Sequence, residues 1–192
     1  MSLDYVLVRN NYKPSKIKFL LVAESPPAFE GYFYLDSATG RDYLFKETMK
    51  AIGLFPEDKR MQRGFDKRPL LKEFQRRGFF LIDVSYKPVN SMTRRKRRLV
   101  IREAIPRLVA ETVELNPERI IIVKASIYDD VKDALEKAGF AAKILNKRTL
   151  PFPSHGHQKV YRQMLRGFLH HLLQANDALQ SNSWYDLATV VL

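Results

Sequence analysis

The chain contains no cysteine. This absence excludes disulfides, a cysteine nucleophile and any zinc or iron–sulfur site held by cysteine, and it fits a reducing compartment. Long apolar runs are also missing, because none approaches the roughly 18 residues of a membrane span, and the N-terminus lacks the basic-then-apolar pattern of a signal peptide. The sequence therefore predicts a soluble, cytoplasmic protein with no membrane partner.

Acidic residues are outnumbered, with 21 Asp and Glu against 33 Lys and Arg and a net charge of +12. This excess favours a partner that carries phosphates, which makes DNA, or RNA, the expected partner. A membrane surface or a ribosome would account for the same charge. The hydrophobic content of 45% is ordinary for a globular protein, and 192 residues most simply form one domain.

Four short aliphatic runs predict strands, at 17–23, 79–85, 119–125 and 141–146. They are continuous rather than alternating, as in strands that are covered on both faces. Segments with helical spacing lie between them, at 41–54 and 128–140, with Gly53 and Gly139 where each helix would end. This order predicts an α/β fold, a three-layer α/β/α sandwich around a central, mainly parallel, four-stranded sheet.

Two further helices are predicted. The segment 97–115 carries an apolar stripe that Pro106 interrupts, so we expect a kink or a restart there. The stripe consists of Ile101, Ala104, Ile105, Leu108, Thr112 and Leu115. The last helix should span 158–173, with Val160, Met164, Phe168 and Leu172 inward. We expect one domain over 1–192 with its core at about 17–173, and the pattern assigns nothing to the tail 174–192.

The loop after the first predicted strand reads "ESPPAFEGYFY", residues 24–34. Ligands of parallel sheets bind beyond the carboxyl ends of the strands, where this loop would lie. Glu24 or Glu30 could activate a water as general base, with a pKa raised by partial burial, or Glu24 could bond backbone N–H groups of its own turn. Among the aromatic residues of the loop, Phe33 or Tyr34 is expected to stack on a base.

The loop after the second strand contains "RRKRR". These five consecutive cations are Arg94, Arg95, Lys96, Arg97 and Arg98. Each of them could neutralise a phosphate at the ligand edge. A solvated helix start is the alternative, but cations at a helix N-terminus oppose its macrodipole.

The last predicted loop, "LPFPSHGHQ", precedes the final helix. Ser154 could cap that helix while the helix N–H groups face a phosphate. His155 and His157 could instead form an H-x-H metal pair with Glu24 or Asp36. That alternative predicts a metal-dependent phosphoesterase.

Taken together, these segments resemble the uracil-DNA glycosylase superfamily, in particular the branch whose first motif reads GEAPG. The similar stretches, in the family's order from about residue 17 to 173, are "AESPPAFEGYFYLDSATGRDYLFKETMKAIGL", "LIDVSYKP", "IREAIPRLVAETVELNPERIIIVKAS" and "PFPSHGHQ", the last resembling an HPSP loop. The resemblance implies the three-layer fold and an enzyme that flips a damaged base out of DNA and hydrolyses its glycosidic bond.

The resemblance also implies roles. Glu24 or Glu30 would activate the water, and His155 would stabilise the charge of the departing base. Ser25, Ser154 and His157 would grip phosphates together with the five cations, and Asp83 would read the base.

The chain departs from the family at several positions. Ser25 stands where several branches have aspartate or asparagine, and Phe152 replaces the histidine of the HPSP motif, although His155 is close enough in sequence to substitute. The cysteines that hold an iron–sulfur cluster in that branch are absent, so no cofactor is expected.

The departure at Asp83 concerns specificity. The asparagine that reads uracil in the family corresponds to Asp83, and an ionised carboxylate only accepts hydrogen bonds. We therefore expect a base that presents two donors, as guanine-like edges do, or a pocket that no longer reads uracil.

Three functions follow from this sequence. The first is a DNA-repair glycosylase that removes a damaged base. The alternative is a catalytically inactive nucleic-acid-binding module of the same fold, which the departures at Ser25, Phe152 and Asp83 favour. The third, less favoured, is the metal-dependent phosphoesterase that would use the histidines.

Overall fold

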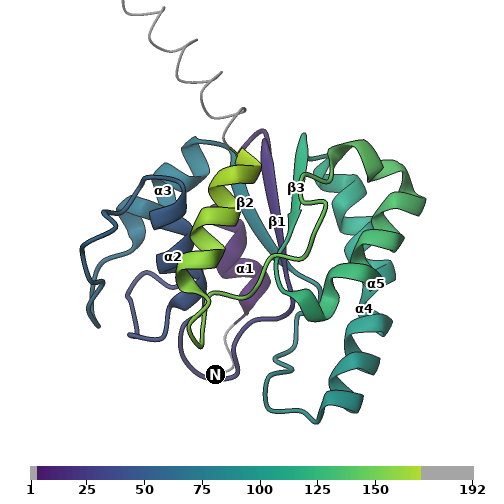
Figure 1. Ribbon diagram of the computed structural model, residues 1–192, viewed down its shortest axis with the longest axis horizontal. Coiled ribbons are helices and arrows are strands. Elements are labelled where there is room, and N and C mark those ends of the chain that lie inside the picture. Colours follow the sequence, from purple (N-terminus) through teal and green to yellow (C-terminus); the bar gives the residue numbers. More distant parts are fainter. Residues whose placement is uncertain (1–3, 170–192) are drawn as a thin grey trace, which may run out of the picture.

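Three parallel strands form the centre of the molecule (Figure 1). In this computed structural model, which describes residues 4–169, they are β1 (Phe19–Ala23), β2 (Phe79–Asp83) and β3 (Arg119–Ile122), in the order β2-β1-β3. Every residue of β1 and β2 is buried, as the continuous aliphatic runs predicted. Ala23 pairs with Asp83, so β1 and β2 end side by side.

The predicted fourth strand at 141–146 does not form. Residues Ala141–Lys143 are a 3-10 helix, and only isolated parallel bridges, Ile120 with Ile144 and Val123 with Leu150, continue the sheet beyond β3. Asn146 explains the difference, because its side chain accepts from Ile122 N at 3.0 Å and donates to Ile122 O at 3.0 Å. This amide takes the hydrogen bonds that a neighbouring strand would otherwise make.

Helices flank the sheet. They are α1 (Tyr5–Asn10), α2 (Tyr43–Ala51), α3 (Arg68–Arg76), α4 (Arg94–Leu115), α5 (Ala125–Leu135), the π-helix η1 (Glu136–Phe140) and the helix 158–169. The helices predicted at 41–54 and 128–140 are confirmed, and Gly53 and Gly139 have φ of 74° and 88° at their ends. In Figure 1, α3 lies on the β2 side of the sheet and α5 on the β3 side.

Helix α4 contains both the predicted apolar stripe and the basic run. Ile101, Leu108 and Thr112 are buried, which confirms the stripe. Pro106 lies inside the helix, which continues past it without a restart. The basic run is not a loop, because α4 begins at Arg94 and Thr93 caps it by accepting from Lys96 N at 3.4 Å.

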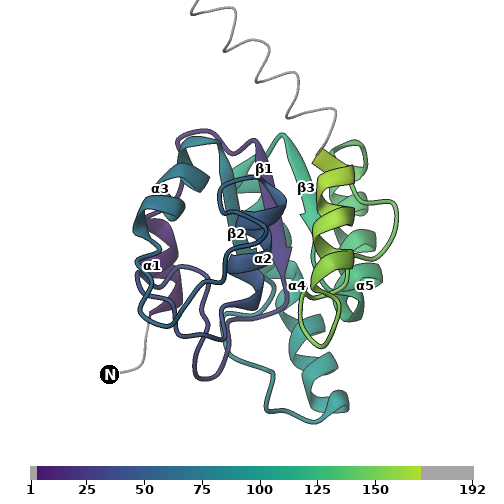
Figure 2. The same cartoon turned by 60° about the vertical axis from the view of Figure 1, so that its left-hand side comes forward.

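The final helix lies beside α2 (Figures 1 and 2), where the Tyr161 and Thr48 hydroxyls are hydrogen-bonded at 2.8 Å. The inward face that we predicted for it is wrong by one position. The fully buried side chains are Tyr161, Leu165 and Leu169, whereas Val160 is exposed and Met164 and Phe168 are only partly buried. The end of the predicted core, Leu172 and the tail 174–192 lie outside the described residues.

No helix within residues 4–169 is both long enough and apolar enough to cross a bilayer.

Candidate functional site

A small pocket opens where β1 and β2 end. Its volume is about 140 Å³, close to the roughly 150 Å³ of an engineered cavity that holds one benzene ring. Its polar lining consists of Glu24, Ser25, Glu30, Arg41, Asp83, Asn90 and Lys124, and its walls include Ala23, Tyr32, Phe33, Leu44, Leu81 and Phe152. A pocket of this size suits a single planar ring.

A second hollow, which we call the arginine groove, lies next to the small pocket and shares Glu24 and Lys124 with it. Its volume is about 570 Å³, and it is lined by Arg94, Arg97, Arg98, Ile101, Ala125, Ser126, Asp129 and Asp130 in addition to the two shared residues. Helices α4 and α5 both begin in this groove. The N–H groups of a helix start favour an anion, so the groove combines arginines with a second anion-binding element.

Two of the three acidic residues of the groove, Glu24 and Asp130, are paired with cations, whereas Asp129 has no ion pair within residues 4–169. Arg102 binds Asp130 with two hydrogen bonds of 3.1 Å, and Glu24 is held as described below. Arg94 and Arg98 form no ion pair within residues 4–169. These two guanidinium groups are therefore free to bind phosphate.

Glu24 separates the pocket from the groove. Its carboxylate accepts from Arg97 Nε at 2.8 Å and from Ser126 Oγ at 3.0 Å, and it also binds Arg97 Nη2 and Lys124 Nζ. Burial alone would raise the pKa of Glu24, but the hydrogen bonds and charges of Arg97 and Lys124 outweigh burial and lower it. The expected rise in this pKa is therefore wrong, and so is bonding of the carboxylate to its own turn.

Lys124 links the two hollows. It lies two residues after β3 and directly before α5 with φ 89°, a conformation that is rare for a residue with a side chain and that recurs at functional sites. Burial lowers the pKa of Lys124, against the opposing effect of Glu24. Its ammonium group also lies 5.5 Å from the centre of the Phe152 ring, on the pocket wall.

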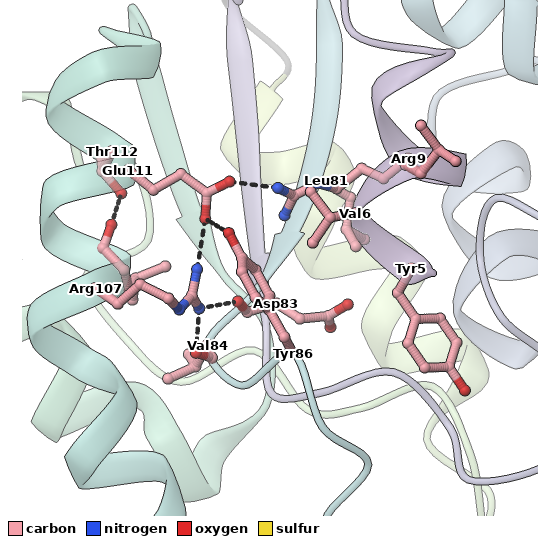
Figure 3. Close-up of polar contacts among 12 residues, drawn as sticks. Tyr5, Val6, Arg9, Leu81, Asp83, Val84, Tyr86, Arg107, Glu111 and Thr112 are labelled. Carbon is pink, nitrogen blue, oxygen red and sulfur yellow. Dashed lines mark hydrogen bonds and ion pairs between the residues drawn. The ribbon is translucent and has the colours of Figure 1, made fainter. Parts of the chain in front are cut away.

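Asp83 is the other buried carboxylate of the pocket. Its side chain makes no hydrogen bond with any residue of the described part of the chain, and Figure 3 shows it pointing away from the polar contacts around it. Burial raises the pKa of Asp83 to about 7, although Arg9 and Arg107 oppose this and Glu111 and Glu24 add to it. At neutral pH this group exists in both protonation states.

A partly buried polar network fixes the end of β2 (Figure 3). Arg107 donates to Asp83 O at 3.0 Å, to Val84 O and to Glu111 Oε2 at 2.8 Å. Glu111 also binds the buried Arg9 of α1 and the Tyr86 hydroxyl, the latter at 2.9 Å. Both arginines thus form their ion pairs with Glu111, and neither forms a salt bridge with the Asp83 carboxylate.

The predicted stacking residues Phe33 and Tyr34 belong to the core. Phe33 packs between Phe45 and Phe74, and Tyr34 bonds the Leu81 backbone at 2.7 Å through its hydroxyl. Tyr34 is fully buried and lines neither hollow, so its position does not support the predicted stacking, whereas Phe33, although buried, lines the small pocket. Phe29 of the same loop is 84% exposed and is a further candidate.

Glu30 and Ser25 both line the pocket, as predicted. Glu30 is paired with Arg63 through hydrogen bonds of 2.8 and 3.0 Å at the surface. Ser25 Oγ accepts from Val89 N at 3.4 Å and so joins the pocket loop to the segment after β2. Ser25 faces the small pocket rather than the arginine groove.

The histidine loop reaches the site only through Phe152, which lines the pocket. Ser154 does not cap the final helix, because that helix begins at 158 and the Ser154 hydroxyl bonds His155 Nδ1 at 2.8 Å. His155 and His157 are exposed and line neither hollow. Within residues 4–169 no three His, Asp or Glu side chains converge as metal ligands, so the predicted metal pair has no third ligand there.

The five cations of the basic run divide into two groups. Arg94, Arg97 and Arg98 line the groove, whereas Arg95 and Lys96 point to solvent outside it. Arg97 is engaged by Glu24. Of the five cations expected to bind phosphate, Arg94 and Arg98 therefore both line the groove and lack an ion pair within residues 4–169. Arg95 and Lys96 lie next to them in the chain.

Sequence reasoning missed Lys124 and Ser126. The sequence did contain a signal for both residues. Lys124 directly follows the aliphatic run "RIIIV" and Ser126 lies at the start of the helix after it, and this position lies at the edge of a parallel sheet where ligands bind.

Comparison of the chain with models of known protein families gives no match, and comparison with curated proteins gives none either.

Proposed function

We propose that the protein is an N-glycosylase that acts on DNA. A single base, turned out of the strand, would enter the small pocket, while the phosphates beside it would bind in the arginine groove. Enzymes that cleave bases from duplex DNA need both features, because the reacting bond is out of reach inside the stack. The proposal carries with it the three-layer α/β/α architecture of the uracil-DNA glycosylase superfamily, in which the 144–150 segment would stand in for a fourth strand.

One observation supports this proposal above the others: a ring-sized pocket with an unpartnered buried carboxyl directly adjoins a groove lined by arginines. The net charge of +12 supports the same partner. The distribution of charge matters more than its sum, because the free arginines gather at the ligand edge of the sheet.

Glu30 is the better candidate for activating water. Both oxygens of Glu24 already accept hydrogen bonds from cations or from Ser126, which stabilises the ionised form and makes it a weak base. Glu30 lines the same pocket and has one surface partner, Arg63, which can be displaced at little cost. Glu24 would then hold Arg97 and Lys124 in place.

The reaction is a hydrolysis. A water oxygen, losing a proton to Glu30, bonds to C1′ of the sugar while the bond from C1′ to the base nitrogen breaks. The electron pair leaves with the base, which takes up a proton, and an abasic site remains. Lys124, at the boundary of pocket and groove, would stabilise the negative charge on the departing base.

The binding module remains the second candidate because of one observation. His155, the residue expected to assist the leaving base, lies outside the pocket. A chain that kept the pocket and groove without effective catalysis would bind DNA in the same way.

The test is a base-excision assay on labelled single- and double-stranded oligonucleotides that carry uracil, hypoxanthine, xanthine or only intact bases. Abasic sites are read by alkaline cleavage. We expect cleavage at one modified base, loss of cleavage in Glu30→Gln and Asp83→Ala, and no effect of Asp58→Asn, which alters an exposed aspartate outside the site. Salt-sensitive binding without cleavage of any substrate would reject the glycosylase in favour of the binding module.

A further inference from the structure

The Asp83 carboxyl is placed to contact a ring in the pocket. Asp83 ends β2, and its neighbours in the lining include the apolar side chains of Leu81, Phe33 and Ala23. Asp83 is only 6% exposed, and its side chain makes no hydrogen bond within residues 4–169. Its oxygens are nevertheless not fully enclosed, because Arg9 Nε is the buried side-chain atom that lacks a partner in that part of the chain. The carboxyl lines the pocket and is therefore available for a hydrogen bond with a ligand.

The charged groups around Asp83 come from three elements. Arg9 of α1 approaches from one side, and Arg107 and Glu111 of α4 from another. Glu24 follows β1 and is itself held by Arg97 and Lys124. The two arginines share Glu111, and their effect on Asp83 is opposed by the charges of Glu111 and Glu24.

Two tyrosines complete the surroundings. The Tyr32 hydroxyl donates to Tyr5 O at 2.8 Å, and the Tyr5 hydroxyl donates to Pro27 O at 3.1 Å. Burial and the nearby Asp83 charge raise the pKa of both phenols, so they remain neutral at any working pH. Burial has the largest effect on the Asp83 carboxyl, and the charges of Glu111 and Glu24 oppose those of Arg9 and Arg107, so the protonated form is favoured.

Protonation changes what the carboxyl can recognise. A neutral carboxyl offers one O–H donor beside one carbonyl acceptor, which is the pattern of an asparagine amide. A carboxyl kept neutral to donate a hydrogen bond is a known device of enzyme active sites. The expectation that Asp83 must reject uracil assumed the ionised form, and the burial of this side chain removes that assumption.

We propose that Asp83, in its neutral form, binds the edge of a single ring that presents one donor beside one acceptor, as uracil does. Ionisation leaves the same side chain with acceptors only, which suit two adjacent donors and not the uracil edge. Base preference would therefore change with pH, through one residue at the end of β2. This inference rests on the proposed function, because it assumes that the pocket holds a base.

The test uses free uracil as the probe and measures its binding to the full-length protein by ligand-observed NMR from pH 5.5 to 8.5. Wild-type affinity should be constant in acid and fall roughly tenfold per pH unit above neutrality. Asp83→Asn keeps one donor and one acceptor at every pH, so its affinity should match that of the wild type at pH 5.5 and stay constant. Asp58→Asn is the control and should retain the wild-type pH dependence.

Several results would overturn the inference: no uracil binding by the wild type, wild-type binding that ignores pH, or a pH dependence that persists in Asp83→Asn. The excision assay separates this failure from failure of the proposed function. If the protein excises uracil but its affinity for uracil does not depend on pH, the glycosylase proposal stands and recognition by a neutral Asp83 is rejected. If it neither binds nor excises uracil, both proposals are rejected.

Discussion

Glu24 and Asp83 are two carboxylates at the ends of adjacent strands, and each is 6% exposed. Their pKa values nevertheless move in opposite directions, lowered for Glu24 and raised to about 7 for Asp83. The difference lies in their partners, because Arg97 and Lys124 bind Glu24 directly whereas the arginines near Asp83 are engaged by Glu111. One carboxylate holds cations for the groove, and the other remains available to a ligand.

The largest effect should come from Asp83→Asn. Because the folded pKa of Asp83 is raised from 3.8 to about 7, the wild type loses stability as pH rises from about 4 to 7, on the order of 4 kcal/mol. The variant should lack this loss. Urea unfolding at pH 4 and pH 8 measures it, with Asp58→Asn as control. Parallel pH curves for wild type and Asp83→Asn would show that burial does not govern this carboxyl.

Glu24→Ala should produce the opposite pattern. It leaves Arg97 and Lys124 without their partner, which should cost roughly 3 kcal/mol at pH 7. Since the pKa of Glu24 is lowered, its stabilising effect is present above the usual glutamate pKa and declines as the pH falls through the lowered value. The deficit of the variant should therefore shrink in acid. A deficit that is independent of pH would mean that packing, rather than charge, is lost.

Phe29→Ala tests whether the exposed ring in the loop after β1 contributes to DNA binding. If Phe29 stacks on a base, its removal should weaken binding of single-stranded DNA by about 1–3 kcal/mol. Fluorescence anisotropy measures this, and Leu7→Ala, another exposed apolar side chain, is the matched control. Equal affinities for wild type and Phe29→Ala would remove the stacking role.

The smallest effect is expected in the groove. Arg98→Ala should weaken DNA binding about equally for all sequences. The slope of the logarithm of the binding constant against the logarithm of the salt concentration should become less steep by about 1. Lys59→Ala, an exposed cation outside both hollows, should leave that slope unchanged. A slope that changes equally in both variants would indicate diffuse charge rather than a groove.

Much of the fold was predictable because it depends on local pattern. Continuous aliphatic runs identified β1, β2 and β3, and the ligand edge followed from their parallel order. The prediction of a fourth strand was wrong because the buried amide of Asn146 makes the hydrogen bonds to Ile122 that a strand backbone would otherwise make. The amino-acid sequence alone does not show that a side chain takes the place of a backbone there. The inward face of the helix 158–169 was missed by one residue because it depends on contacts with the distant α2.

The site was less predictable than the fold, because it too depends on contacts between residues that are distant in the chain. Glu24 was identified by its place after a predicted strand and Asp83 through the family resemblance, but the protonation of a carboxylate depends on its partners, such as Arg97, 73 residues from Glu24 in the chain. Phe33 and Tyr34 carried the expected chemistry, yet aromatic residues beside a sheet are buried when the core has room for them. Composition cannot distinguish these rings from Phe29.

The most direct test of the central claim is a crystal structure, grown at pH 6, with an oligonucleotide that carries a non-hydrolysable 2′-fluoro-uracil nucleotide. The account predicts that the uracil ring lies in the small pocket with its edge on the Asp83 carboxyl, and that an adjacent phosphate lies in the groove near Arg98. A uracil that stays in the strand, or DNA bound to another face with the pocket empty, would contradict it.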